Sequence, residues 1–143
     1  MKTALLTMAI ALMAFIPQGF AMDGTMNKEM AEKSATPVTA IAFHSDNCGS
    51  CKILGPRMKE AMKAVNTDKV NVIKFDFTNK ETIAATKTLA SEKGVDNVLQ
   101  QYGAKTGFVI LLDKDGNEVD KLKVDDNTAD IATKIVKAIV GQS

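Results

Sequence analysis

The chain has few of the residues on which metal sites, nucleic-acid sites and disulfide frameworks depend. Its 143 residues include two Cys, one His, one Tyr and no Trp. Two Cys and one His cannot complete a four-ligand structural zinc site within one chain, and they allow one disulfide at most. Lys and Arg total 18 against 17 Asp and Glu, so the basic excess of a nucleic-acid-binding protein is missing. We therefore expect no nucleic-acid partner and no multiply bridged scaffold.

Proline and glycine are also sparse, with 3 and 9 residues, while 45% of the chain is hydrophobic and 24% is charged. This composition excludes collagen, low complexity and intrinsic disorder. The length suits one domain around one hydrophobic core. We expect a monomer, and we assign no cofactor and no metal ligand.

The N-terminal segment has the pattern of a secretory signal peptide. Lys2 supplies a positive charge, and residues 4–16 are apolar except for Thr7. Gly19 and Ala21 then place small residues three and one before an expected cut. The apolar run is shorter than the ~20 residues of a membrane-spanning helix, and the alternative is an N-terminal core helix. We predict a signal peptide over 1–21 and a periplasmic or secreted protein that begins at Met22.

The remaining chain alternates between helical and strand periodicity. Residues 22–36 form an N-terminal extension with a short leading helix, and one domain follows over 37–143. The order indicates an α/β fold with a central mixed sheet and helices on both faces. The expected elements are a strand at 38–44, a helix from 51 to 66, a strand at 70–77, a helix from a cap at 78 or 79 to 93, a shorter helix at 95–102, a strand at 108–112, a strand at 118–124 and a helix after a cap at 126 or 127.

The candidate chemistry lies at Cys48-Gly49-Ser50-Cys51, between a strand and a helix. This spacing lets the two sulfurs approach bonding distance, and Gly49 permits a tight backbone. Amide groups and the positive dipole at a helix N-terminus stabilise a thiolate on Cys48. Cys51, inside the helix, can then attack a mixed disulfide and release a partner. The alternatives are a static disulfide and half of an intermolecular metal site.

At this point the sequence resembles the thioredoxin superfamily over residues 38–140. The most specific match is Phe-His-Ser-Asp-Asn-Cys-Gly-Ser-Cys-Lys at 43–52, followed by Pro56. The resemblance implies a thioredoxin-like fold in which Cys48 is the attacking thiol and Cys51 the resolving one. It further implies that Pro56 bends the active-site helix. Residues 72–76 resemble the family's central strand, and the exported context resembles periplasmic members.

The chain departs from the family pattern at three positions. Asn47 stands where the family usually has Trp, and Ala42 stands where it often has a buried Asp. The loop that usually carries a cis-proline falls at 105–108 and contains no proline. A non-proline cis bond costs about 3 kcal/mol, so we expect a trans loop rebuilt around Gly107. Thr106, Gly107 and Phe108 should face the thiols, and Gly107→Pro should change turnover more than stability.

Two further side chains are candidates for a supporting role. His44 lies four residues before Cys48 and either stabilises a thiolate, moves its proton or is a strand-end side chain without a role. Lys74 either lies beneath the active site, as the resemblance implies, or belongs to a solvated strand face. The sequence leaves both alternatives open.

We interpret the chain as an exported thiol–disulfide oxidoreductase that exchanges disulfides with protein partners through Cys48 and Cys51. A membrane-bound or soluble redox partner would complete its cycle. The alternatives are a module that binds a soft metal such as Cu(I) through both thiols, and a redox-inert scaffold with a permanent disulfide. The sequence does not indicate the direction of electron flow.

Overall fold

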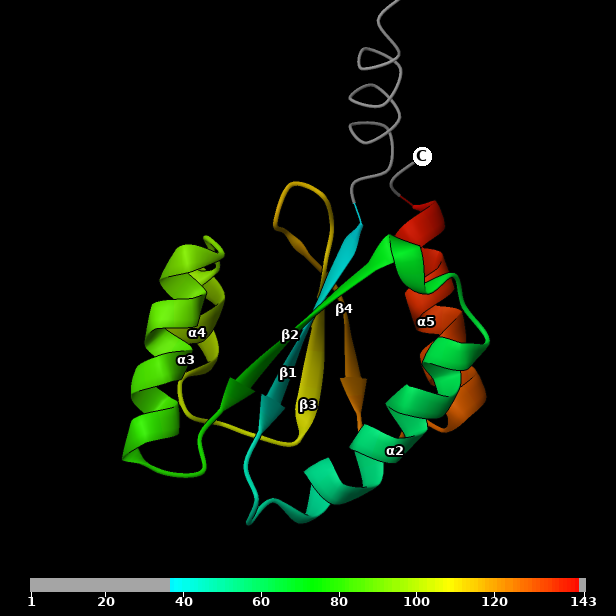
Figure 1. The fold of residues 1–143 in the computed structure, drawn as a ribbon. Coiled ribbons are helices and arrows are strands. Elements are labelled where there is room, and N and C mark those ends of the chain that lie inside the picture. Colours follow the sequence, from blue (N-terminus) through cyan, green and yellow to red (C-terminus); the bar gives the residue numbers. More distant parts are fainter. Residues whose placement is uncertain (1–36, 142–143) are drawn as a thin grey trace, which may run out of the picture.

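The computed structural model describes residues 37–141, so the predicted signal peptide and leading helix lie outside the described residues. Helices and strands alternate as the periodicity predicts (Figure 1). The strands expected at 38–44 and 108–112 are confirmed without a shift. The elements are β1 Val38–His44, α2 Gly49–Lys63, a 3-10 turn at Thr67–Lys69, β2 Val70–Asp76, α3 Lys80–Glu92, α4 Asp96–Tyr102, β3 Phe108–Leu112, β4 Glu118–Lys123 and α5 Thr128–Val140.

The four strands form one sheet in the order β2-β1-β3-β4. β1 and β2 are parallel and are joined through α2, whereas β3 runs antiparallel to both β1 and β4. The mixed sheet of an α/β fold is therefore confirmed. The expectation that 72–76 would be a central strand is wrong for the described sheet, where β2 is an edge strand and Val72 is 51% exposed. All five residues of β3 are buried, and such a strand requires neighbours on both sides.

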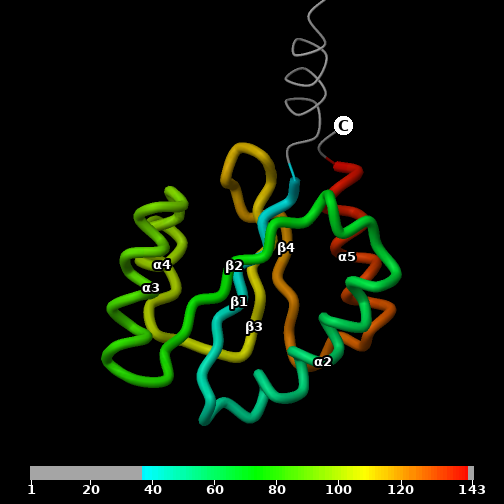
Figure 2. Tube along the Cα trace, in the orientation of Figure 1, coloured from blue at the N-terminus to red at the C-terminus, as the bar shows by residue number. Residues whose placement is uncertain are grey.

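Helices cover both faces of the sheet, with α2 and α5 on one side and α3 and α4 on the other (Figures 1 and 2). Alternate residues of each strand point to opposite faces, which gives two core clusters. Val38 and Ala40 of β1 pack with α2 and α5, while Ile41 and Phe43 pack towards α3 and α4. Each fully buried Ile or Phe contributes roughly 1.5–3 kcal/mol, so these two clusters hold the layers together.

Three helices have ends or bends that the sequence specifies. Asn79 caps α3 and Asn127 caps α5, each in a reciprocal capping box that satisfies free backbone amides. Pro56 lies inside α2 and removes one backbone donor, and α2 changes direction along its length (Figure 1). Among residues 37–141, the helices are too short or too polar to cross a membrane.

The sheet register brings the candidate site together. Phe43, near the end of β1, pairs with Phe108, at the start of antiparallel β3. The segment that follows β1 and carries Cys48 therefore meets the loop that precedes β3 and carries Gly107. The pairing of β1 with β3 therefore brings together Cys48 and Gly107, which are far apart in the sequence.

Candidate active site

Cys48 and Cys51 are joined by a disulfide at the N-terminus of α2, with their Cα atoms 5.2 Å apart. Cys48 is the N-cap residue, with an extended backbone, and its Sγ accepts a hydrogen bond from the amide of Cys51 at 3.1 Å. This confirms the expected place of Cys48 just before the first helical residue. The free amides and the positive dipole end of α2 therefore lie at the Cys48 sulfur.

The two sulfurs differ in accessibility. Cys48 is half-buried, whereas Cys51 is buried with 8% of its surface exposed. The Sγ atom of Cys51 lies 3.5 Å from the carbonyl oxygen of Phe43. An incoming sulfur therefore meets Cys48 first, with Cys51 behind it.

Gly49 and Ser50, between the two cysteines, contribute differently. Gly49 is helical, and a Cβ atom added there would meet nothing within 4 Å. The tight backbone expected of Gly49 therefore does not require glycine. Ser50 faces Gly107, because a Cβ atom built on Gly107 would lie 2.9 Å from the Cβ of Ser50 and 3.4 Å from the Sγ of Cys48.

The loop opposite the cysteines is rebuilt around Gly107, as expected. Every peptide bond within residues 37–141 is trans, and Gly107 has a φ of +95°. Its amide donates a hydrogen bond to the carbonyl of Phe43 at 2.9 Å. Gly107→Pro should therefore cost stability as well as change turnover, because proline cannot adopt this φ and has no amide to donate.

The neighbours of Gly107 in this loop are Thr106, which is half-buried, and Phe108. The Phe108 ring stacks on Phe43 with their centroids 4.6 Å apart, in the core on the α3–α4 side. Of the three residues expected to face the thiols, Gly107 is the one that approaches Cys48 most clearly.

His44, the last residue of β1, lines a cleft of about 60 Å³ together with Cys51. Its side chain is 29% exposed, and its Nε2 lies 3.2 Å from a carboxylate oxygen of Asp46. Ala42, where the resemblance expects a buried Asp, lines the same cleft. The structure therefore places His44 and the resolving Cys51 on the lining of the same cleft.

Lys74 belongs to an ion pair on the exposed edge strand. Its Nζ lies 2.9 Å from a carboxylate oxygen of Asp76, and its side chain is 54% exposed. A hydrogen bond from the Thr78 hydroxyl is the main cause that lowers the pKa of Asp76 from 3.8 to about 2, and Lys74 adds to it. Lys74 pairs with Ala42 in the β1–β2 register but is not among the described residues that line the cleft at Cys51.

Thr78 lies near the site, although the sequence pattern predicted it only as a candidate helix cap. Asn79 caps α3 instead, while the hydroxyl oxygen of Thr78 accepts a hydrogen bond from the amide of Asp46 at 3.1 Å. Thr78 thus ties the loop before Cys48 to the end of β2. The expected parallel pairing of β1 and β2 could have indicated this contact, because the residues that follow two parallel strands lie at the same end of the sheet.

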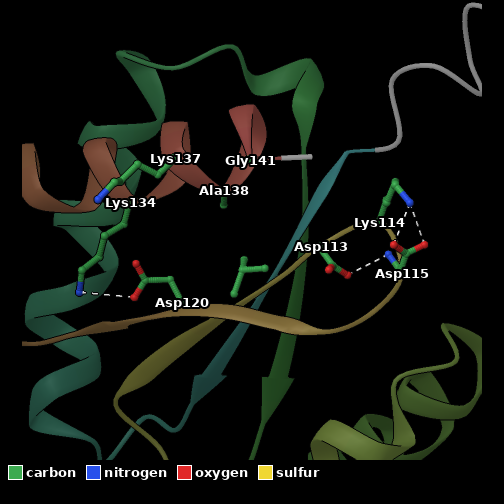
Figure 3. A pocket seen from close by; sticks show the side chains of 9 residues that line it. Asp113, Lys114, Asp115, Asp120, Lys134, Lys137, Ala138 and Gly141 are labelled. Carbon is green, nitrogen blue, oxygen red and sulfur yellow. Dashed lines mark hydrogen bonds and ion pairs between the residues drawn. The ribbon is translucent and has the colours of Figure 1, made fainter. Parts of the chain in front are cut away.

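Two larger hollows lie away from the cysteines. One of about 400 Å³ lies between the β3–β4 hairpin and α5 and carries charges of both signs, with Lys134 and Asp120 3.9 Å apart across it (Figure 3). Another, of about 590 Å³, lies between α3 and α4. Neither Cys48 nor Cys51 is among the described residues that line these hollows. The candidate active site is therefore the surface around the disulfide at the N-terminus of α2, and not either of these hollows.

A four-stranded mixed sheet between helix pairs, with a Cys-x-x-Cys disulfide at the first helix after β1, defines a protein of the thioredoxin fold. Residues 21–92, half of the chain, match the family model described as Thioredoxin. The chain belongs to the thioredoxin family.

Curated relatives include the mitochondrial thioredoxins of Mus musculus and Rattus norvegicus, each 32% identical over 99 residues. The match covers 69% of this chain and 49% of each relative, so the chain spans about half the length of the curated relatives it matches.

Solved structures share the fold at low sequence identity. A thiol:disulfide interchange protein of the thioredoxin family from Chlorobium tepidum is 14% identical, with a TM-score of 0.50 over 76% of this chain and 84% of that one. The thioredoxin domain of a thiol-disulfide oxidoreductase from Bacteroides vulgatus is 15% identical, with a TM-score of 0.50 over 76% of this chain and 83% of that one.

Proposed function

We propose that this protein is a thiol–disulfide oxidoreductase that exchanges disulfides with protein partners through Cys48 and Cys51. The observation that carries the proposal is the arrangement of the two sulfurs. The partly exposed Cys48 Sγ accepts the Cys51 amide at the helix N-terminus, and the buried Cys51 lies directly behind it. Membership of the thioredoxin family supports the same function.

The helix N-terminus favours the reactive form of Cys48. A thiolate there gains the hydrogen bond from the Cys51 amide and the field of a 15-residue helix. Residues 49–52 carry no acidic side chain that would oppose this negative charge, and Lys52 adds a positive one. The thiolate is the nucleophile in disulfide exchange, so these features suit Cys48 to attack.

In the reducing direction, the Cys48 thiolate attacks one sulfur of a partner disulfide. A mixed disulfide forms, and the other partner sulfur leaves as a thiolate that takes up a proton. The Cys51 sulfur, after losing its proton, then attacks Cys48, which breaks the mixed disulfide and forms the Cys48–Cys51 bond found in the structure. Two electrons pass to the partner, and the reverse sequence oxidises a partner dithiol.

The surface around Cys48 suits a polypeptide partner. Asn47 and Gly49 are exposed on either side of it, and Thr106 is half-buried in the facing loop. All three of these residues are uncharged. We propose that partners are protein thiols or disulfides, and that a membrane-bound or soluble redox protein resets the pair.

The test is reduction of a model protein disulfide by purified protein in the presence of a chemical reductant. Wild-type protein should accelerate the reduction, and Cys48→Ser should abolish the acceleration while its circular dichroism stays that of the wild type. Full turnover by Cys48→Ser would contradict the mechanism.

We also propose that the protein is exported. The support is the charged start, the apolar run at 4–16 and the small residues Gly19 and Ala21. N-terminal sequencing of protein isolated from cells should give Met22 as the first residue. Protein that retains Met1 in a soluble extracytoplasmic fraction would contradict the cleavage.

A further inference from the structure

The cleft beside Cys51 is almost entirely apolar. Its lining includes Ala42, Leu54, Met58 and Val109 from β1, α2 and β3. Its volume of about 60 Å³ is large enough for one water molecule, for which His44, Cys51 and the Phe43 carbonyl are the polar neighbours. Among the described residues that line it, His44 is the only one besides Cys51 whose side chain can accept or release a proton.

Cys51 needs a proton acceptor during disulfide exchange. It attacks the mixed disulfide as a thiolate, so its thiol must first lose a proton. In the thiol form, Cys51 can donate a hydrogen bond to the carbonyl oxygen of Phe43, 3.5 Å from its Sγ, but this oxygen cannot take the proton away. A base that lines the cleft would therefore speed this proton loss.

The hydrogen bond between His44 and Asp46 leaves the second ring nitrogen of His44 able to accept a proton. A carboxylate accepts hydrogen bonds and cannot donate them, so Asp46 at 3.2 Å places the ring proton of neutral His44 on Nε2. Nδ1 then carries the free lone pair, and it has no hydrogen-bond partner within the described residues.

The other charged groups on this face of the sheet are less suited. Lys74 and Asp76 on β2 pair with each other at 2.9 Å, and the Asp76 carboxylate also accepts two hydrogen bonds from Thr78. Neither is among the described residues that line the cleft. The residues that α2 and β3 present to the cleft are uncharged.

We propose that His44 is the proton acceptor for Cys51, acting through a water molecule in the cleft; this inference rests on the proposed function. In the resolving step the Cys51 thiol passes its proton through the water to Nδ1 of His44. The Cys51 sulfur then bonds to Cys48, the bond between Cys48 and the partner breaks, and the partner leaves as a thiolate. The imidazolium returns its proton to that thiolate or to solvent.

The experiment is stopped-flow oxidation of the reduced protein by a nitrobenzoate disulfide, which releases one coloured thiolate when Cys48 attacks and a second when Cys51 resolves. This leaving thiolate needs no proton at neutral pH, so the second phase reports proton loss from Cys51. Both phases are measured at several pH values on either side of neutrality. The variants are His44→Gln and His44→Asn, and the matched control is Asp76→Asn.

We expect both His44 variants to slow the second phase by about tenfold or more and to leave the first within about twofold. The pH dependence of the second phase should differ from that of the wild type in these variants and be retained in Asp76→Asn. Circular dichroism at each pH checks that the variants are folded.

A second phase as fast as that of the wild type in both His44 variants would overturn the inference, and so would equal slowing of the two phases. Wild-type protein that releases no coloured thiolate would instead contradict the proposed function, so the two failures are distinguishable.

Discussion

The amide of Gly107 donates a hydrogen bond to the carbonyl oxygen of Phe43 at 2.9 Å. This bond anchors the loop before β3 to the end of β1, beside the sulfur of Cys51, which lies 3.5 Å from the same oxygen. It holds Gly107 at a φ of +95°, with space for hydrogen but not for a side chain. The loop opposite the disulfide therefore depends on glycine where the resemblance expects a cis-proline.

Gly107→Ala should destabilise the protein by more than backbone strain alone. The alanine Cβ would lie 2.9 Å from the Cβ of Ser50. Gly116→Ala is the matched control, because Gly116 has a φ of +82° and open space around the new Cβ. Both variants incur strain of about 1–3 kcal/mol, and we expect Gly107→Ala to lose about 1 kcal/mol more. Urea unfolding measures the difference, and equal losses would contradict the close contact.

Asp76 should make stability depend on acidity. The Thr78 hydroxyl, with Lys74, holds the pKa of Asp76 at about 2 against an ordinary 3.8. The group is ionised more readily in the folded state, so its stabilisation is present above pH 3.8 and is lost as pH falls through about 2. At neutral pH, Asp76→Asn should lower the free energy of unfolding in urea by about 1 kcal/mol. Near pH 2 the variant and the wild type should be almost equally stable.

Thr78→Val tests how much the Thr78 hydroxyl, apart from the other causes, lowers the pKa of Asp76. Loss of the largest cause should raise the pKa of Asp76 towards its ordinary value, as followed by carboxyl carbon NMR. Lys74→Gln is the comparison and should raise it less. A larger rise with Lys74→Gln would reverse the assigned order of causes.

Tyr102, the one tyrosine of the sequence, gives an isolated optical signal. Its hydroxyl donates to the carboxylate of Glu118, at 2.6 Å for the nearer oxygen, and this contact raises the pKa of Tyr102 from 10.0 to about 12. The neutral phenol is favoured in the folded state, so its stabilisation is present below pH 10 and is lost as pH rises through about 12. Phenolate absorbance should show this titration, and Glu118→Gln should lower the midpoint. An unchanged midpoint would contradict the contact.

Local sequence signals predicted the elements that carry the site. The limits of β1 and β3 follow from apolar runs bounded by Pro37 and Gly107, and the place of Cys48 follows from a strand signal directly before a helix signal. The sequence also identified the missing proline as the point where the loop is rebuilt. Each of these features depends on residues close together in the chain.

The contacts around the disulfide could not be predicted in the same way, because tertiary packing sets them. The hydrogen bond between Asp46 and Thr78 joins residues 32 positions apart. The orientation of β1 against α2 decides that His44 lines the cleft at Cys51. Lys74 and Asp76, by contrast, are two residues apart on β2, and what the sequence did not indicate there is the place of β2 at the edge of the sheet.

The most direct test of the central claim is to trap the mixed disulfide. Reduced Cys51→Ser protein is mixed with a protein disulfide, quenched with acid and examined by non-reducing electrophoresis and peptide mass spectrometry. We predict a covalent adduct whose cross-link maps to Cys48, which dithiothreitol removes and which the Cys48→Ser, Cys51→Ser double variant does not form. Absence of the adduct in folded Cys51→Ser protein would contradict the account.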